Sequence, residues 1–146
     1  MTTVAKIMSR RVLDVDMDVN LKEVRDIFNH VHFHHILVKD GGQLVGIVSD
    51  RDLLKAVSPY LGTSGERLRD TATLKKRVHQ IMTRKPITIG VEGNVLDAIR
   101  CFIDHRISCL PVLNPDGSVA GILTWRDILK AIVASAEHAH DKEHGR

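Results

Sequence analysis

Two short stretches of this chain combine a hydroxyl, an arginine and a carboxylate at the same spacing. Ser49-Asp50-Arg51-Asp52 follows one apolar run, and Thr124-Trp125-Arg126-Asp127 follows another. A Ser or Thr three residues before an acid is a capping pattern that satisfies the free N–H groups at the start of a helix. The same geometry aims a helix N-terminus at an anion, and the carboxylate could accept both hydroxyls of a ribose. A structural cap and a nucleotide site are both open, and neither excludes the other.

These stretches belong to an internal duplication. Seven of the twelve residues at positions 46–57 recur in the copy that begins at Gly121. Further upstream, Ile7-Met8-Ser9-Arg10 is matched by Ile81-Met82-Thr83-Arg84. Similarity at a fixed offset is the mark of a repeated structural unit, so the chain is predicted to contain two copies of one unit.

Each copy predicts the order strand, helix, strand, strand, helix. Short apolar strands are expected at 12–15 and 87–89, and Asn20 and Asn94 are candidate caps of the helices that follow. Asp-Gly pairs at Asp40-Gly41 and Asp116-Gly117 lie between apolar runs and predict a hairpin in each copy. The final helix of each copy begins near Ser49 or Thr124.

The repeats set the expected domain organisation. The first motif covers 1–57, a partly helical linker 58–79, the second motif 80–136 and a polar tail 137–146, with the two motifs forming one module. Within the linker, 66–79 is predicted to be helical with Leu68, Ala72 and Val78 on its buried side, and the basic run at 75–77 is expected to be solvated.

Composition narrows the class of protein. Hydrophobic residues make up 43% and charged residues 27% of the 146 residues, which is a globular balance, and the net charge is +3. Aromatic residues make up only 3%, which argues against a nucleic-acid partner that stacks bases on aromatic rings. There is no long apolar run for a membrane, and the two cysteines form no CxxC motif. A cytoplasmic protein with reduced thiols is expected.

Catalytic signatures are absent from the sequence. It contains no GxxxxGK[ST], HExxH, GxSxG or GxGxxG motif, and no catalytic pair stands out. The sequence therefore predicts a protein that is not an enzyme.

Several motifs together resemble the CBS-domain pair, also called a Bateman module. They are the opening Ile81-Met82-Thr83 with Pro86 and Thr88, the run from His105 to Leu110-Pro111-Val112, and the two Gly-x-x-Ser/Thr-x-x-Asp closings. The first copy departs from the pattern, with Val12 in place of the strand proline, Asp14 in place of Thr88 and Leu37 in place of Pro111. The resemblance covers nearly all of the chain except the linker and tail.

The resemblance implies an α+β fold of two tandem CBS motifs, each β-α-β-β-α, related by a pseudo-two-fold axis. It further implies clefts between the motifs that bind adenosine-containing ligands, and pairing of two modules into a disc. A symmetric homodimer is also favoured by the four amphipathic helices around a thin sheet core, and by Trp125 at a helix start with no evident role there.

The candidate ligand-binding residues combine the two capping stretches with the apolar strand openings and the turns before the hairpins. An adenine base would need a flat apolar slot, and phosphates would need cations. The candidates are Ser49, Arg51, Asp52, Thr124, Arg126, Asp127, Val12, Leu13, Pro86, Ile87, Thr88, His32, His34, Arg106, Ile107 and Ser108. Ordinary core strand remains the alternative interpretation of the strand openings.

Histidines cluster at His30, His32, His34 and His35, which leaves a metal site open as an interpretation. No carboxylate or cysteine stands at a convincing ligand spacing, so no metal ligands are assigned.

The leading hypothesis is a regulatory module that senses adenine nucleotides, AMP or ATP, without a required cofactor, and transmits a conformational or oligomeric change to an effector protein. The alternatives are an interaction scaffold that binds no ligand and a His-dependent metal sensor.

Overall fold

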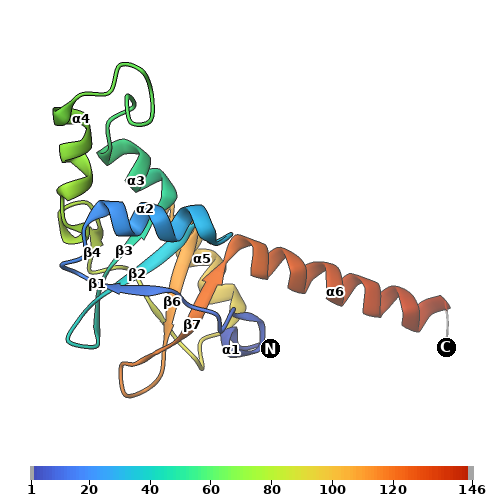
Figure 1. The fold of residues 1–146 in the computed structure, drawn as a ribbon. Helices are drawn as coiled ribbons and strands as arrows, with labels where there is room; N and C mark the ends of the chain where they lie inside the picture. Colours follow the sequence, from blue (N-terminus) through green and yellow to red (C-terminus); the bar gives the residue numbers. More distant parts are fainter. Residues whose placement is uncertain (1, 145–146) are drawn as a thin grey trace. The chain divides into compact units, whose positions relative to one another are not determined.

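The computed structural model describes residues 2–144, and it divides the chain into two compact units (Figure 1). One unit is Leu13–Pro86; the other combines the segment up to Val12 with the chain from Ile87 onward. The predicted order of strand, helix, strand, strand, helix is confirmed in both copies. The fold is therefore α+β, with a small mixed sheet and helices in each motif, as the sequence analysis expected.

The unit Leu13–Pro86 is built on a sheet with the strand order β1-β2-β3-β4. Strand β1 (Asp14–Asp16) pairs in parallel with β2 (His35–Asp40), and β2 pairs antiparallel with β3 (Gln43–Ser49). Helix α2 (Leu21–His30) joins β1 to β2, and α3 (Asp50–Ala56) follows β3. The apolar sides of these elements form one core, whose fully buried members include Leu21, Val24, Ile36, Val38 and Val48.

The second unit repeats this arrangement. Strand β5 (Ile89–Gly90) pairs in parallel with β6 (Cys109–Leu113), which pairs antiparallel with β7 (Val119–Thr124). Helix α5 (Val95–His105) joins β5 to β6, and the 20-residue α6 (Trp125–His144) follows β7. Its core is formed by buried side chains that include Val4, Phe102, Leu110, Val112 and Leu123.

The turns and caps follow the local chemistry of the sequence. In the first hairpin, Gly41 and Gly42 take φ values of 58° and 86°, a left-handed conformation that glycine adopts without strain. Gly117 has a φ of 88° in the second hairpin. The side chains of Asn20 and Asn94 accept hydrogen bonds from the N–H groups of Glu23 and Asp97, so both act as the predicted helix caps.

The strand openings differ from the prediction. Strands were expected at 12–15 and 87–89, but β1 begins at Asp14 and β5 at Ile89. Leu13 contributes one hydrogen bond, with its carbonyl accepting from the N–H of Leu37 at 2.9 Å, but the paired ladder starts one residue later. The residues before each strand are therefore irregular and half-buried.

The linker also differs from the prediction. Only Leu68–Ala72 forms an α-helix (α4), followed by two short 3-10 turns at Thr73–Lys75 and Val78–Gln80. The expected burial is confirmed for Val78, which is fully buried, but it is wrong for the other two residues: Leu68 is 88% exposed, and Ala72 is exposed as well. Asp70 is buried instead, because its carboxylate accepts from the Ser58 hydroxyl at 2.6 Å and the Arg67 N–H at 2.8 Å. A hydrogen-bonded acid thus replaces the expected apolar contact.

The segments that open the two repeats, 7–10 and 81–84, are exchanged: each one packs against the strands of the other repeat. Met82, from the second opening, packs on Gly46 of the first repeat, and Met8, from the first opening, packs on Gly121 of the second. Strand β4 (Thr83–Arg84) pairs antiparallel with β3, and Ser9 forms the corresponding bridge with Ile122. A short helix, α1 (Val4–Ile7), precedes Met8. The boundaries of the compact units therefore differ from those of the sequence repeats, because each unit includes the opening segment of the other repeat.

No helix among residues 2–144 combines the length and the apolar character that crossing a membrane requires.

Candidate ligand-binding residues

Ser49 and Asp52 form a complete capping box at the start of α3. The Ser49 Oγ accepts from the Asp52 N–H at 3.1 Å, and the Asp52 Oδ2 accepts from the Ser49 N–H at 2.8 Å. Both side chains are half-buried. The prediction that this stretch caps a helix is therefore confirmed. The two residues satisfy each other's N–H groups and fix the direction in which the helix leaves the sheet.

Thr124 and Asp127 repeat this arrangement at the start of α6. The Asp127 Oδ2 accepts from the Thr124 N–H at 2.9 Å and the Thr124 hydroxyl at 3.2 Å, while the Asp127 N–H donates to the Thr124 Oγ1 at 3.4 Å. In both boxes the carboxylate uses Oδ2. Among residues 2–144 no hydrogen bond reaches the Oδ1 of Asp52 or of Asp127. Each carboxylate keeps one oxygen that can accept from a ligand hydroxyl.

Beside the first capping box lies a hydrogen bond between two side chains that the sequence analysis missed. The Nδ1 of His34 is 2.9 Å from the Oδ2 of Asp50, the first residue of α3. This hydrogen bond is the main reason that the pKa of Asp50 lies below its ordinary value. His34 was a predicted site residue but Asp50 was not, although its place between Ser49 and Arg51 in the repeat could have marked it.

His35 starts β2 and is half-buried, whereas its neighbours His32 and His34 are exposed. Burial lowers the pKa of His35, although the carboxylates of Asp50 and Asp52 act in the opposite direction. Desolvation disfavours the charged imidazole more than these carboxylates favour it. The structure therefore favours a neutral His35 beside the acidic start of α3.

In the second repeat, the same positions carry neutral groups. Cys109 takes the place of His35, and burial raises the pKa of its thiol to about 12. Trp125 takes the place of Asp50, and its indole Nε1 donates to the carbonyl of Ile107 at 3.3 Å. The indole also stacks on Phe102, with 5.5 Å between ring centroids. Trp125 thus has a role within its own unit, and its presence no longer argues by itself for a dimer.

The remaining candidates fall into two groups. Val12, Leu13, Pro86, Ile87 and Thr88 are half-buried strand-opening residues, as an apolar slot requires. The exposed cations and imidazoles form the second group, for which no hydrogen bond or ion pair is found among residues 2–144; they are His32, Arg51, Arg106 and Arg126. Ile107 is half-buried and Ser108 is exposed.

Asp14, the acid that replaces a threonine in the first repeat, is paired. Its Oδ2 is 3.0 Å from the Nζ of Lys39 on the neighbouring strand β2. The lysine offsets the negative charge that this carboxylate would present to a phosphate.

The described residues bring no three His, Cys, Asp or Glu side chains together as ligands for a metal ion. The histidine cluster is instead divided: His30 hydrogen-bonds to the carbonyl of Asp26 within α2, and His34 pairs with Asp50.

Two repeats with the same strand and helix order, each closed by a Ser/Thr–Asp box at a helix start, define a tandem pair of small α+β motifs. Residues 4–59 and 78–134 match the model of the CBS domain family. The chain belongs to the CBS domain family as a tandem pair, and the resemblance inferred from its motifs is confirmed.

The relatives differ in how much of their own length this chain matches. A CBS domain-containing protein of Dictyostelium discoideum is 31% identical over 136 residues, which make up 92% of this chain and 93% of that protein. Two relatives with enzyme names, homoserine O-acetyltransferase of Methanosphaera stadtmanae and inosine-5′-monophosphate dehydrogenase of Korarchaeum cryptofilum, are matched over only 23% and 22% of their own lengths.

Two similar solved structures hold adenosine compounds. The structure of CBSX2 in complex with AMP is 26% identical, with a TM-score of 0.77 over 93% of this chain and 99% of that chain. The CBS domain pair of protein MJ0100, in complex with 5′-methylthioadenosine and S-adenosyl-L-methionine, is 26% identical, with a TM-score of 0.75 over 92% of this chain and 98% of that chain.

Proposed function

We propose that this chain is a regulatory module that binds an adenine nucleotide, AMP or ATP, and transmits a change in conformation or assembly to an effector protein. The observation that carries the proposal is the unused Oδ1 of Asp52 and Asp127 at two equivalent capping boxes. The AMP complex of a protein with the same fold over nearly the whole chain supports the same ligand class.

The proposed roles follow from the chemistry of each group. The Oδ1 atoms of Asp52 and Asp127 accept the ribose hydroxyls, and the half-buried strand openings contact the adenine. The exposed cations Arg51, Arg106 and Arg126 are available for phosphate. The role is binding rather than catalysis, no further cofactor is proposed, and neither nucleic acid nor a membrane is a proposed partner.

Binding changes the protein only through a difference in affinity between two states. We therefore place the regulatory step in a homodimer whose two states bind the nucleotide unequally, with the effector protein reading the change. With both cysteines free, a cytoplasmic location is proposed.

Isothermal titration calorimetry on the full chain tests the proposal, with AMP, ATP, 5′-methylthioadenosine, S-adenosyl-L-methionine and Zn²⁺ in separate titrations. Saturable binding of AMP or ATP is the expected result. Binding of the sulfur-containing adenosines alone would keep the ligand class but replace the nucleotide. Binding of Zn²⁺ alone would favour the metal sensor, and no binding at all would favour the scaffold.

A further inference from the structure

The two capping boxes share their internal bonds but differ in the residue that follows the Ser or Thr. This residue is Asp50 in the first repeat and Trp125 in the second. The next residue along the chain is an arginine in both repeats, Arg51 and Arg126. The first box therefore has one carboxylate more than the second, in the same turn of helix as the carboxylate to which we assign the ribose.

The hydrogen bond from His34 does not remove the charge of Asp50. The His34 Nδ1 lies 2.9 Å from the Asp50 Oδ2, and this bond is the main reason that the pKa of the carboxyl is lowered, which favours the ionised form. A neutral imidazole donates such a bond without bringing a positive charge. Among residues 2–144, no Lys or Arg side chain forms an ion pair with Asp50, whereas Asp14 has the ammonium of Lys39 at 3.0 Å.

Asp50 is near enough to Asp52 for both to act on one side chain. Burial is the largest influence on the pKa of His35 and lowers it, while Asp50 and Asp52 both act on the same imidazole by charge and raise it. Exposed charges interact over about 8 Å at physiological salt before screening removes most of the effect. A ligand held at the Oδ1 of Asp52 is therefore within range of the Asp50 charge.

The second box has a neutral side chain at the equivalent position, held in place by its own unit. The Trp125 indole donates to the carbonyl of Ile107 at 3.3 Å and stacks on Phe102, with 5.5 Å between ring centroids. These contacts bring no charge to the start of α6. A phosphate near the second box would meet no counterpart of the Asp50 carboxylate.

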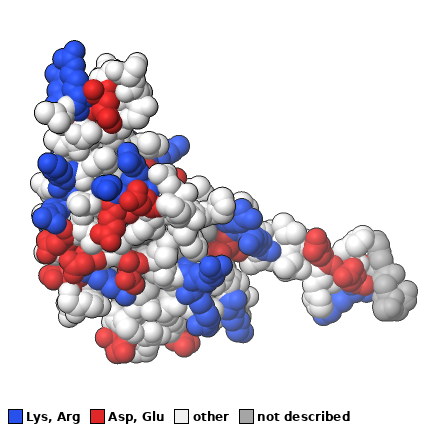
Figure 2. Space-filling view, in the orientation of Figure 1, with Lys and Arg blue, Asp and Glu red and all other residues white. Residues whose placement is uncertain are grey.

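The charge of the whole chain does not override this local difference. Figure 2 shows Lys and Arg side chains interspersed with Asp and Glu side chains on the face that it draws, and the net charge is only +3. A surface of mixed sign gives a weak overall field, so the nearest charges decide which anion is accepted.

We propose that Asp50 is a specificity-determining residue that disfavours a 5′-phosphate at the first capping box. The first box then prefers an adenosine compound whose 5′ group is neutral or positively charged, and AMP binds preferentially at the second box. The inference rests on the proposed function, because it divides the proposed ligand class between the two boxes. Asp50 acts through its charge and makes no contact of its own with the ribose.

Calorimetry with two matched ligands tests the difference between the boxes. AMP and 5′-methylthioadenosine share the base and the ribose, but the first carries a phosphate at the 5′ position and the second a neutral methylthio group. Asp127→Asn leaves the first box intact, and Asp52→Asn leaves the second intact. At low salt and pH 8, where histidine is ordinarily neutral, AMP relative to methylthioadenosine should bind about three- to tenfold less well at the first box than at the second.

Removing the Asp50 charge is the decisive change. In the Asp127→Asn background, Asp50→Asn should tighten AMP binding by about three- to tenfold and leave methylthioadenosine within about twofold, because only AMP carries a phosphate for the carboxylate to repel. Asparagine keeps an oxygen that can accept from His34, so the local structure is preserved. Circular dichroism melts check that each variant folds.

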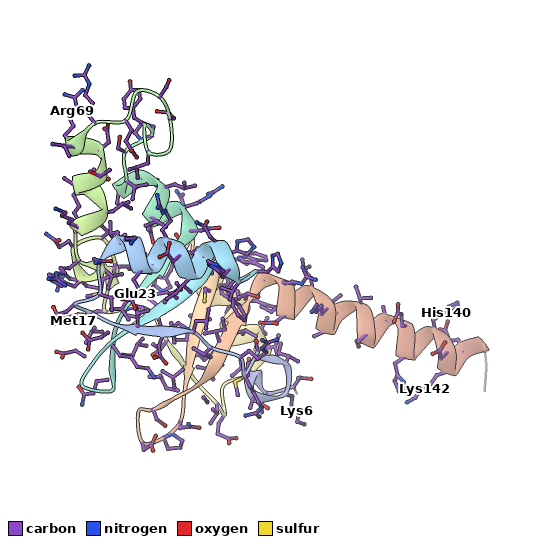
Figure 3. The ribbon with its side chains drawn as sticks, viewed as in Figure 1. Lys6, Met17, Glu23, Arg69, His140 and Lys142 are labelled. Atoms are coloured by element: carbon purple, nitrogen blue, oxygen red, sulfur yellow. The ribbon has the colours of Figure 1, made fainter. Side chains whose placement is uncertain are left out.

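Two controls remove an equal charge elsewhere in the same unit. Asp40 lies at the far end of β2, about 17 Å from His35 by the rise of a strand. Glu23 lies on the first turn of α2 (Figure 3). Asp40→Asn and Glu23→Gln should leave the affinity for both ligands unchanged. An equal gain in AMP affinity from these controls would overturn the inference, since net charge alone would then explain the result.

The remaining outcomes separate this inference from the proposed function. Unchanged AMP affinity in Asp50→Asn, or an Asp127→Asn variant that binds neither ligand, overturns the role of Asp50. The proposed function still stands in both cases if Asp52→Asn binds AMP. A wild type that binds neither ligand overturns both.

Discussion

Asp52 and Asp127 each cap a helix with one carboxylate oxygen, Oδ2, and leave the other, Oδ1, without a hydrogen bond among residues 2–144. A conservative substitution can therefore separate helix capping from ligand binding. Asp52→Asn and Asp127→Asn keep an oxygen that caps the helix but remove the charge. A hydrogen bond to a charged group is worth about 1.5–3 kcal/mol, so each change should weaken AMP binding by roughly ten- to a hundredfold. Calorimetry measures the affinity, and thermal melts should stay close to the wild type because the cap remains.

Unchanged AMP affinity in both variants would leave only the capping role for these residues. The interaction scaffold would then be the better function for the chain.

The half-buried imidazole of His35 predicts a pH dependence of stability. Burial lowers the pKa of His35 below its ordinary value of 6.5, so the unfolded chain takes up a proton at a higher pH than the folded chain. Stability from this residue is complete above 6.5 and falls as the pH drops from there toward the folded pKa. Urea unfolding at pH 7.5 and pH 5 should show a larger loss of stability in the wild type than in His35→Gln. Equal losses in the two proteins would show that His35 does not couple folding to protons.

The two thiols should differ in reactivity. Burial raises the pKa of Cys109 to about 12, whereas Cys101 is half-buried on α5. The thiolate is the reactive form, so a thiol reagent at pH 8 should modify Cys101 well before Cys109. Mass spectrometry after timed labelling, with Cys101→Ser as the control, identifies the site. Rapid labelling of Cys101→Ser would mean that Cys109 is open to solvent.

At the scale of elements, the glycines of β3 and β7 hold the opening segments in place. A Cβ on Gly121 would lie 2.5 Å from the Ser9 carbonyl oxygen, which belongs to the backbone, whereas one on Gly46 would mainly meet the flexible Met82 side chain. Gly121→Ala should therefore lower the free energy of unfolding by about 1–3 kcal/mol, and Gly46→Ala by less. Gly90→Ala is the control, because nothing lies within 4 Å of a Cβ there.

Urea unfolding of the three variants measures these differences. If Gly121→Ala were as stable as Gly90→Ala, the segment around Ser9 would not be packed on β7 as the structure has it.

Local signals explain why so much of each repeat could be predicted. Asp-Gly turns, asparagine caps and alternating apolar runs act over a few residues, so they fix the order of elements and the two capping boxes. The crosswise packing of Met8 and Met82 depends on contacts between segments far apart in the chain, which no local pattern reports. Leu68 was misplaced for a similar reason, since Asp70 is buried by bonds to Ser58 and Arg67. Asp50 was missed because its partner, His34, comes from another element.

At the scale of the whole molecule, folding should not require a metal ion. Each unit has its own apolar core, and no three potential ligands meet among residues 2–144. A strong chelator should leave the midpoint of thermal unfolding unchanged, measured by circular dichroism on protein purified without an affinity tag. A drop of several degrees on chelation, reversed by added Zn²⁺, would show that the histidines bind a structural metal.

The exchange of opening segments between the two repeats suggests how a chain of this kind arises from a single repeat. In a protein with a single repeat, the glycine that Gly46 and Gly121 represent would be covered by the opening segment of another molecule, which makes a domain-swapped pair. The present chain has the arrangement of such a pair fused end to end, with Met8 and Met82 as the exchanged parts. A protease cut in the loop between α3 and α4 would therefore not release two independent halves, because each half would still hold a segment that belongs in the core of the other.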